Sequence, residues 1–232
     1  MPRTEKLAFI SDIHSNLEAL EAVLGEIGGT PTYCLGDVVG YGASPNEVIT
    51  LLKEGSVTCI RGNHDWAALS GKVNEFNASA LQALTWTARN LTAESRKFLE
   101  TLPLNRSVIF RGETVYMAHG SPDDNLWEYV YPSTHSDLFG YYLQKLGAEA
   151  IALGHTHSPF EWTGPEGLVF NPGSVGQPRN GDPRASYAVL EPARHGLAVR
   201  HRTVKYDVGE AARKIIASGL PPSLASRLQF GQ

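Results

Sequence analysis

Short, largely apolar runs alternate with amphipathic stretches through the first sixty residues of the chain. The apolar runs predict buried strands, and apolar positions recurring every three or four residues predict helices packed on them. The predicted order is strand 7–10, helix 16–27, strand 32–35, helix 45–53 and strand 57–60. This alternation is typical of a parallel sheet with crossover helices.

The rest of the chain is helical first and strand-rich later. The middle predicts helices 77–90 and 92–101, a hairpin of strands 106–110 and 114–118, helix 133–146 and strand 150–153. The last third predicts strands 160–163, 168–170, 187–190 and 197–204 and a closing helix 208–218. Segment 171–184 is rich in Gly, Pro and Asn and predicts a long loop, either functional or simply mobile. Without a repeat or linker, we expect one domain over residues 1–232.

Composition narrows the classes of partner. Hydrophobic residues make up 42% of the 232 residues, which is enough for a real core. A net charge of −4 provides no basic footprint, so we expect no stable nucleic-acid complex. No apolar stretch reaches about 18 residues, and the N-terminal one is too short for a signal peptide. We therefore expect a cytoplasmic protein with no membrane partner, and the sequence is compatible with a homo-oligomer.

Metal-binding residue types directly follow several predicted strands. The segments are Asp12-Ile13-His14, Gly36-Asp37, Gly62-Asn63-His64-Asp65, His119-Gly120 and Gly154-His155-Thr156-His157. Binding groups in open α/β sheets collect beyond the carboxyl ends of strands, so these segments can meet at one edge. On an extended chain, residues two apart point to the same side, which would pair Asp12 with His14 and His155 with His157.

The residue types favour particular metals. Mixed nitrogen and oxygen ligands suit Mn, Fe, Ni, Zn or Co better than Ca or Mg. The glycines before the ligands allow the tight turns and close backbone approach that a crowded site needs.

These segments, in this order over about residues 7–170, resemble the calcineurin-like metallophosphoesterase superfamily. The short chain is most similar to its bacterial and archaeal small phosphodiesterase-like branch. The resemblance implies an α/β fold, a four-layer α/β/β/α sandwich with two mixed β-sheets. It also implies hydrolysis of a small phosphoester substrate at two divalent transition-metal ions, with Mn the first choice and Fe, Ni, Zn or Co the alternatives.

The resemblance also implies a role for each side chain. One metal would be held by Asp12, His14 and His157, the other by Asn63, His119 and His155, and Asp37 would bridge both. A water or hydroxide between the metals would be the nucleophile. His64 would donate a proton to the leaving oxygen or steady the phosphate.

One departure from the family bears on the substrate. In the protein serine/threonine phosphatases the Gly-Asp segment continues to an Asp-Arg-Gly, whose Asp orients the catalytic imidazole and whose Arg binds phosphate. Gly40 and Tyr41 occupy those places here. Asp65 is then the candidate for orienting His64, and a small phosphodiester is favoured over a phosphoprotein. The alternatives are a phosphomonoesterase acting on nucleotides or phosphoproteins, and a non-catalytic interaction module, which the intact His64 disfavours.

Three further residues are candidate substrate contacts, each with a structural alternative. Asn16 either contacts substrate oxygens or caps a helix. Arg61 either approaches a phosphate or is solvated or paired with a surface acid. Arg179, with the loop Asn171-Pro-Gly-Ser174, either lies near an anion cradled by backbone amides or belongs to an ordinary turn.

The remaining aromatic residues and histidines of note are not assigned to the metal centre. Trp127, Tyr129 and Tyr131 form an aromatic strip, for nucleotide stacking, a dimer contact or simple packing. His135, His195 and His201 are expected to be surface or strand residues without a role.

Overall fold

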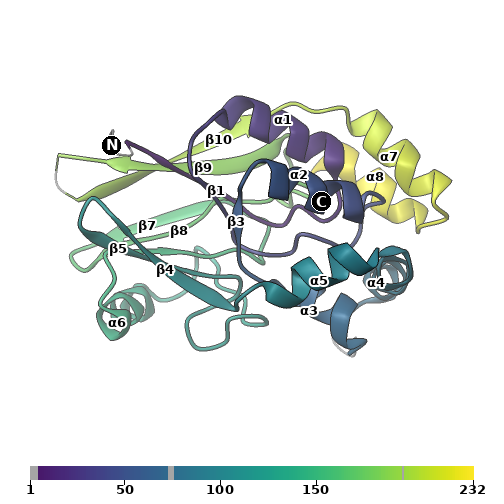
Figure 1. Ribbon diagram of the computed structural model, residues 1–232. Helices are drawn as coiled ribbons and strands as arrows, with labels where there is room; N and C mark the ends of the chain where they lie inside the picture. The colour runs from purple at the N-terminus through teal and green to yellow at the C-terminus, as the bar shows by residue number, and fades with distance from the viewer. Residues whose placement is uncertain (1–4, 73–75, 195) are drawn as a thin grey trace.

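The computed structural model of the protein describes residues 5–72, 76–194 and 196–232, and it is built on two five-stranded sheets (Figure 1). The first sheet has the order β10-β9-β1-β2-β3. Its strands are β1 (Leu7–Ile10), β2 (Thr32–Cys34), β3 (Thr58–Cys59), β9 (Ala185–Pro192) and β10 (Leu197–Val204). β1, β2 and β3 are parallel as predicted, whereas β9 and β10 are antiparallel to their neighbours, so the sheet is mixed.

The second sheet has the order β4-β5-β6-β8-β7 and is also mixed. Its strands are β4 (Asn105–Phe110), β5 (Glu113–Ala118), β6 (Ala150–Ala152), β7 (Phe160–Gly164) and β8 (Gly167–Asn171). β5, β6 and β8 run parallel, so their carboxyl ends lie at one edge.

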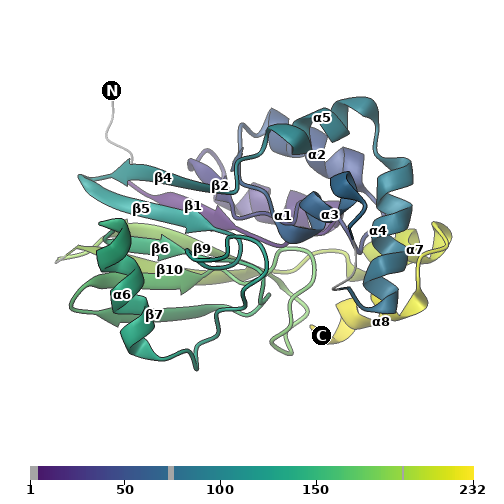
Figure 2. The same cartoon turned by 90° about the horizontal axis from the view of Figure 1, so that it is seen from below.

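Helices cover the outer faces of the sheets and one end of the molecule (Figures 1 and 2). They are α1 (Leu17–Ile27), α2 (Pro45–Glu54), α3 (Asn63–Ser70), α4 (Ala78–Asn90), α5 (Ala93–Thr101), α6 (Ser136–Leu146), α7 (Val208–Ala217) and α8 (Pro222–Phe230). α1 and α2 lie on the first sheet and α6 lies on the second, while α3, α4, α7 and α8 gather at the end toward which β1 and β2 run. None of the described helices is long and apolar enough to cross a membrane.

The alternation of side chains along β1 shows how the layers are held together. Leu7 and Phe9 face the second sheet, and the ring of Phe9 lies 5.1 Å from that of Phe170 in an edge-to-face contact. Ala8 and Ile10 face the opposite way and pack with α1 and α2. A third apolar layer joins the second sheet to α6. The fold is therefore the expected α/β/β/α sandwich with two mixed sheets.

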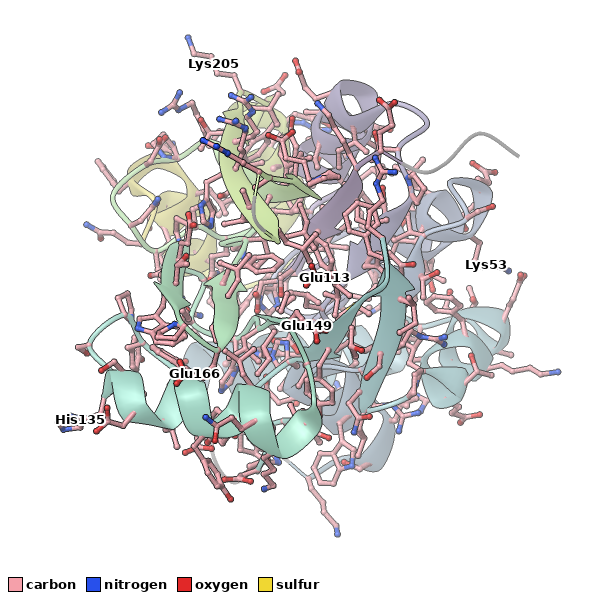
Figure 3. The ribbon with its side chains drawn as sticks, turned by 90° about the vertical axis from the view of Figure 1, so that its left-hand side faces the viewer. Lys53, Glu113, His135, Glu149, Glu166 and Lys205 are labelled. Carbon is pink, nitrogen blue, oxygen red and sulfur yellow. The ribbon has the colours of Figure 1, made fainter. Side chains whose placement is uncertain are left out.

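Sequence patterns missed two helices, α3 and α8. α3 begins at Asn63 itself, so this segment is helical rather than a loop after a strand. The predicted helix 133–146 begins only at Ser136, and His135 before it is exposed and points away from the fold (Figure 3). His201 lies on β10, where its Nε2 contacts the carbonyl oxygen of Asn171, and His195 lies outside the described residues.

Candidate metal centre

The segments with metal-binding residue types meet at the carboxyl ends of five strands. The loops after β1 and β2 are joined by hydrogen bonds from the Asp12 N–H to the Gly36 oxygen, 3.0 Å, and from the His14 N–H to the Asp37 oxygen, 2.9 Å. The loop after β6 joins the end of β5 because the Gly154 N–H donates to the His119 oxygen over 2.9 Å. Backbone hydrogen bonds alone thus hold together residues that are distant in sequence.

The backbone at these loops is left-handed, not extended. φ is 53° at Asp12, 48° at His14, 53° at Asp37, 69° at His155 and 58° at His157. The expectation that residues two apart share a side because the chain is extended was therefore wrong, although the side chains do converge. Left-handed backbone at a residue other than glycine costs about 1–3 kcal/mol and clusters at functional sites. Five such residues in one place mark these loops as a candidate functional site.

Gly62 shows why glycine precedes the ligands. A Cβ atom at this position would lie 2.1 Å from Asp37 Oδ1 and 2.2 Å from the Asp37 nitrogen. No side chain fits in that space, so only glycine allows the start of α3 to approach Asp37 this closely.

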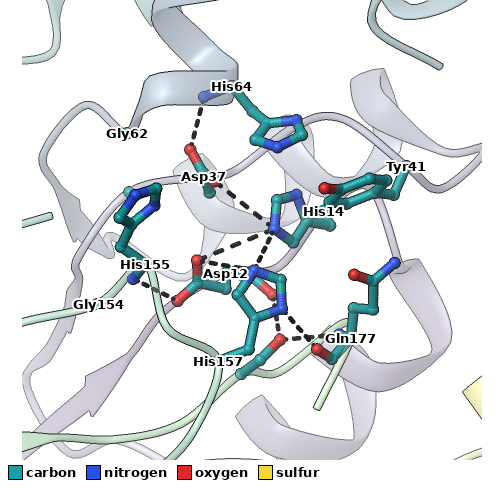
Figure 4. A network of polar contacts seen from close by, with 12 residues as sticks. Asp12, His14, Asp37, Tyr41, Gly62, His64, Gly154, His155, His157 and Gln177 are labelled. Carbon is teal, nitrogen blue, oxygen red and sulfur yellow. Dashed lines mark hydrogen bonds and ion pairs between the residues drawn. The ribbon is translucent and has the colours of Figure 1, made fainter. Parts of the chain in front are cut away.

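Two groups of side chains share the carboxylate of Asp37, and Figure 4 shows the first of them. In the first, Nε2 of His157 lies 3.0 Å from Nε2 of His14 and 3.4 Å from Asp12 Oδ1. In the second, His119 Nε2 lies 3.0 Å from Asn63 Oδ1, and ligand atoms of Asp37, His119 and His155 all lie within 4.8 Å of one another.

Asp37 connects the two groups through a single oxygen. Its Oδ2 lies 3.6 Å from His14 Nε2 and 3.4 Å from His119 Nε2. Its other oxygen, Oδ1, accepts a hydrogen bond of 2.8 Å from the His64 N–H. Asp12 is held in the same manner, because its Oδ2 accepts from the His155 N–H over 3.2 Å while Oδ1 faces His157 without a hydrogen-bond donor among the described residues. Each carboxylate therefore has one oxygen held by the backbone and one turned to the centre.

Backbone carbonyl oxygens fix the tautomers of the imidazoles. Nδ1 of His14 lies 3.2 Å from the Val39 oxygen, and Nδ1 of His157 lies 2.6 Å from the Gln177 oxygen. Since a carbonyl oxygen only accepts, each Nδ1 carries the proton and each Nε2 presents a lone pair to the centre. Nδ1 of His119 faces the Leu35 oxygen at 2.9 Å in the same way. Such partners are typical of metal-binding histidines.

His155 is oriented in the opposite sense. Its Nε2 lies 3.3 Å from the Trp127 oxygen, so Nδ1 is left as its free lone pair.

Burial keeps most of these imidazoles neutral. It lowers the pKa of His155 to about 3 and that of His64 to about 4, and it holds the pKa values of His14 and His157 well below their usual range. Burial acts on His119 too, but the charge and hydrogen bond of Asp37, together with the charge of Asp12 and the hydrogen bond to Leu35, outweigh it and raise the pKa of His119 to about 9.

The carboxylates respond in opposite ways. Burial raises the pKa of Asp12 to about 7. It also acts to raise the pKa of Asp37, but the neighbouring imidazoles, His119 first, outweigh it and hold that pKa well below its usual range.

These side chains fit a divalent cation. Two imidazole lone pairs 3.0 Å apart repel each other, and the buried Asp12 Oδ1 lacks a donor among the described residues. Burying such groups without a partner is costly, and a cation between them removes both penalties. Nitrogen and oxygen donors together suit transition metals.

Known proteins with the same sequence features carry this fold. Residues 6–195 match the calcineurin-like phosphoesterase superfamily domain. The chain belongs to the calcineurin-like phosphoesterase superfamily. It is 35% identical to a metallophosphoesterase from Sphaerobacter thermophilus whose crystal structure superposes with a TM-score of 0.82, covering 98% of this chain and 99% of that one.

Two further proteins are similar to this chain in sequence. Protein MJ0912 of Methanocaldococcus jannaschii is 37% identical, with 97% of this chain and 98% of that protein covered. The phosphodiesterase YfcE of Escherichia coli is 27% identical, with 80% of this chain and 87% of that protein covered. Membership of the superfamily, together with the His and Asp clusters, suggests divalent metal binding.

His64 lies beside the ligands of this phosphoesterase-family centre. Its ring is packed against Tyr41 at 4.5 Å, Phe76 at 4.7 Å and His14 at 4.7 Å between centroids. Its Nδ1 is buried and has no hydrogen-bond partner within the described part of the chain. Gly40 lies against this nitrogen, because a Cβ there would be 2.5 Å from it.

Asp65 does not orient His64, contrary to the expectation from sequence. Its Oδ2 accepts from the Gly62 N–H at 2.9 Å, and its Oδ1 accepts from the Val39 N–H at 3.0 Å. The carboxylate therefore fastens the start of α3 to the loop after β2 and acts on the geometry of the centre, not on the imidazole.

Two of the three proposed substrate contacts have structural roles instead. Asn16 caps α1, since its Oδ1 accepts from the Ala19 N–H at 3.2 Å, and its Nδ2 donates to the Gly176 oxygen at 2.9 Å. Arg61 points away from the centre and donates through Nη2 to the oxygens of Leu99, 2.9 Å, and Glu100, 2.7 Å. It meets carbonyls at the C-terminal end of α5 and neither a phosphate nor an acid, an arrangement that the helix dipole favours.

The third contact, Arg179, lines a cleft above the centre. The cleft encloses about 640 Å³, including space open to solvent. Asp37, His64 and His155 lie along it together with Trp127 and Tyr129 of the aromatic strip. Tyr129 stacks on His155 with centroids 3.9 Å apart, and Tyr131 stacks on the Tyr129 ring at 5.9 Å. Sequence reasoning missed Phe76 and Arg227, which also line the cleft.

The loop 171–184 holds the loop after β1 in place by hydrogen bonds. Ser174 Oγ donates to the Asp12 oxygen at 2.7 Å, and the N–H groups of Val175 and Gly176 donate to the oxygens of Ser11 and Asp12. Those amides are used to hold the loop after β1, so they do not form an anion cradle. Within this loop, Arg179 is the residue that lines the cleft.

Proposed function

We propose that this protein is a phosphoesterase that hydrolyses a small phosphodiester with two divalent transition-metal ions, Mn foremost. The observation that carries the proposal is the single oxygen of Asp37 between two groups of imidazole and amide side chains, 3.6 Å from His14 Nε2 and 3.4 Å from His119 Nε2. A carboxylate shared in this manner suits a pair of cations. The name of the relative YfcE, a phosphodiesterase, supports the choice of reaction.

The ligands divide into two sets in this proposal. Asp12, His14 and His157 would hold one ion, Asn63, His119 and His155 would hold the other, and Asp37 would serve both. When bound, a pair of divalent cations lowers the pKa of a water molecule and neutralises charge on the phosphoryl oxygens.

His64 and Arg179 carry the remaining steps. The buried His64 ring is packed on three sides by aromatic rings, which fixes its direction at the cleft. Its pKa of about 4 keeps it neutral in the free protein, so it delivers a proton to the leaving oxygen after the negative charge of the bound phosphate has raised that pKa. Arg179 lies over the Tyr41 ring at 5.9 Å, and its Nη2 contacts the Tyr41 hydroxyl at 3.3 Å. Tyr41 stands where the phosphatase branch has its phosphate-binding arginine, so Arg179 supplies the missing cation from another loop.

The shape of the site favours a small substrate over a phosphoprotein. Phe76, Trp127 and Tyr129 wall the cleft beside the ligands. Aromatic walls accept a planar group of a small ester, whereas a folded protein surface would need an open approach.

Turnover of bis-p-nitrophenyl phosphate by the purified protein tests the proposal. Activity should appear with Mn²⁺ and disappear with a chelator. His64→Ala should keep its metal content and lose at least about 100-fold in kcat, as expected for loss of a general acid. His135→Ala is the matched control, because His135 is exposed on the far side of the second sheet. If no phosphoester in a broad panel is hydrolysed by the Mn-loaded protein, the interaction-module alternative stands instead.

A further inference from the structure

The outer part of the cleft carries two arginines that the ligand set does not use. Arg179 comes from the loop after β8, and Arg227 comes from α8 near the C-terminus. Both line the same cleft as His64 and Asp37. Arg227 lies outside residues 6–195, the part that matches the superfamily domain.

Arg179 is joined to one of the candidate metal ligands. Its N–H donates to the oxygen of the ligand residue His157 at 3.3 Å, and its Nη2 contacts Gln177 Oε1 at 3.0 Å. Its Nε is buried without an acceptor among the described residues. A buried guanidinium nitrogen without an acceptor is costly, so this side chain is prepared to receive an anion.

Arg227 is held in place by the end of its own helix, and its only side-chain hydrogen bond among the described residues goes to Gln232. Its Nε donates to the backbone oxygen of Gln232 at 2.9 Å, just beyond the end of α8. Buried Leu224 and Leu228 anchor that helix against α4 and α7. The side chain is half-buried and its position is therefore set by packing, not by an acid.

The two positive charges lie close enough to repel each other. Burial and the charge of Arg179 both lower the pKa of Arg227. Neither arginine has a salt bridge to a carboxylate among residues 5–72, 76–194 and 196–232. Like charges placed together in a cleft attract and select anions. The protein has a net charge of −4, yet two positive charges lie together in this cleft. The cleft is therefore suited to a ligand with several negative charges.

We propose that Arg227 is a specificity-determining residue that binds a second phosphate of the substrate, farther from the metal ligands than the phosphate that is hydrolysed. With Arg179 at the scissile phosphate and the aromatic wall of Phe76 and Trp127 opposite, the substrate class is a nucleotide that carries a further phosphate group. This inference rests on the proposed phosphodiesterase function, and it assigns a role to the C-terminal helix.

A pair of matched substrates tests it on the Mn-loaded, full-length protein. One is the p-nitrophenyl ester of thymidine 5′-phosphate, and the other is the same ester with an added 3′-phosphate. The native protein should have a kcat/KM about 10–100-fold higher for the second, as expected for one charge-assisted contact. Arg227→Gln should reduce this ratio by at least about tenfold, and Arg227→Lys should restore part of it.

Arg213→Gln is the matched control. Arg213 is exposed on α7, pairs with Glu210 and does not line the cleft, so its removal should keep the ratio. An equal kcat/KM for the two esters in the native protein, or an unchanged ratio in Arg227→Gln, would overturn the inference.

Calorimetry separates this inference from the proposed function. Thymidine 3′,5′-bisphosphate should bind the native protein about tenfold or more tightly than thymidine 5′-phosphate, and Arg227→Gln should lose this difference. Absence of turnover with both esters would refute the proposed activity, while the binding comparison would still decide whether Arg227 reads a second phosphate. Equal binding of the two nucleotides would refute the subsite.

Discussion

Replacing Gly62 with alanine tests whether the centre depends on the close approach of α3 to Asp37. The added Cβ would lie 2.1 Å from Asp37 Oδ1 and 2.2 Å from its backbone nitrogen. Non-bonded atoms of this kind do not approach closer than 3.0 Å, so Asp37 or the start of α3 must move by about 0.9 Å. Metal ligands tolerate shifts of only about 0.2 Å, so a movement of this size displaces the shared carboxylate from both groups of ligands.

Three quantities should therefore change together in Gly62→Ala. Activity toward bis-p-nitrophenyl phosphate should fall by about 100-fold, the usual cost of a misplacement near 1 Å. Bound Mn, measured by mass spectrometry after desalting, should fall for both ions. The free energy of unfolding of the metal-free protein should drop by about 1–3 kcal/mol because the site is overpacked.

Gly25→Ala provides the matched control. Gly25 lies in α1, and a Cβ added there would have no neighbouring atom within 4 Å, so alanine should stabilise the helix by about 0.5–1 kcal/mol and leave metal content unchanged. If Gly62→Ala retained both ions and native activity, the argument that glycine is needed for the geometry of Asp37 would be refuted.

Three other predictions concern two candidate ligands and Asp65, which holds the start of α3. Asp37→Asn should weaken binding of both ions by at least about 100-fold, and loss of only one ion in a metal titration would contradict the shared role of its carboxylate. Because the pKa of His119 is raised to about 9 while the other ligand imidazoles are neutral, metal binding at pH 8 should displace a proton from His119. Calorimetry in buffers of different ionisation enthalpy should show that His119→Asn releases about one proton fewer than the native protein, and equal release would be inconsistent with that pKa. Asp65→Ala should cost about 1–3 kcal/mol per N–H left without an acceptor, measured by urea unfolding, and a neutral effect would show that its two hydrogen bonds are unimportant.

The sequence predicted the fold and the ligand cluster because both depend on patterns of neighbouring residues, which can be recognised without the structure. Apolar runs such as Leu7–Ile10 mark strands, and polar residues directly after parallel strands must lie at one edge of a sheet. That rule sufficed to bring Asp12, Asp37 and His155 together.

The direction of individual side chains could not be predicted in the same way. Asp12 and His14 adopt left-handed backbone because the hydrogen bonds that their N–H groups donate to the loop after β2 hold them there, and those bonds exist only once β1 and β2 are paired. Asp65 was assigned to His64 by proximity in sequence, yet α3 turns its carboxylate back to Gly62. The Gly-x-x-Asp spacing resembles a helix capping box and could have indicated this helix start.

Arg227 was beyond reach of sequence reasoning for a different reason. α8 is short: it begins at Pro222, directly after Pro221. Its apolar residues form only a weak stripe along the helix. Its position depends on contacts with α4 and α7, which are distant in sequence. A residue that joins a cleft only through such packing leaves no local pattern to detect.

Diffraction from crystals grown with Mn²⁺, recorded at the manganese absorption edge, tests the central claim most directly. We predict two anomalous peaks about 3.5–4 Å apart, one at Asp12, His14 and His157 and the other at Asn63, His119 and His155, with Asp37 between them. A single peak, or none among these side chains, would contradict the account.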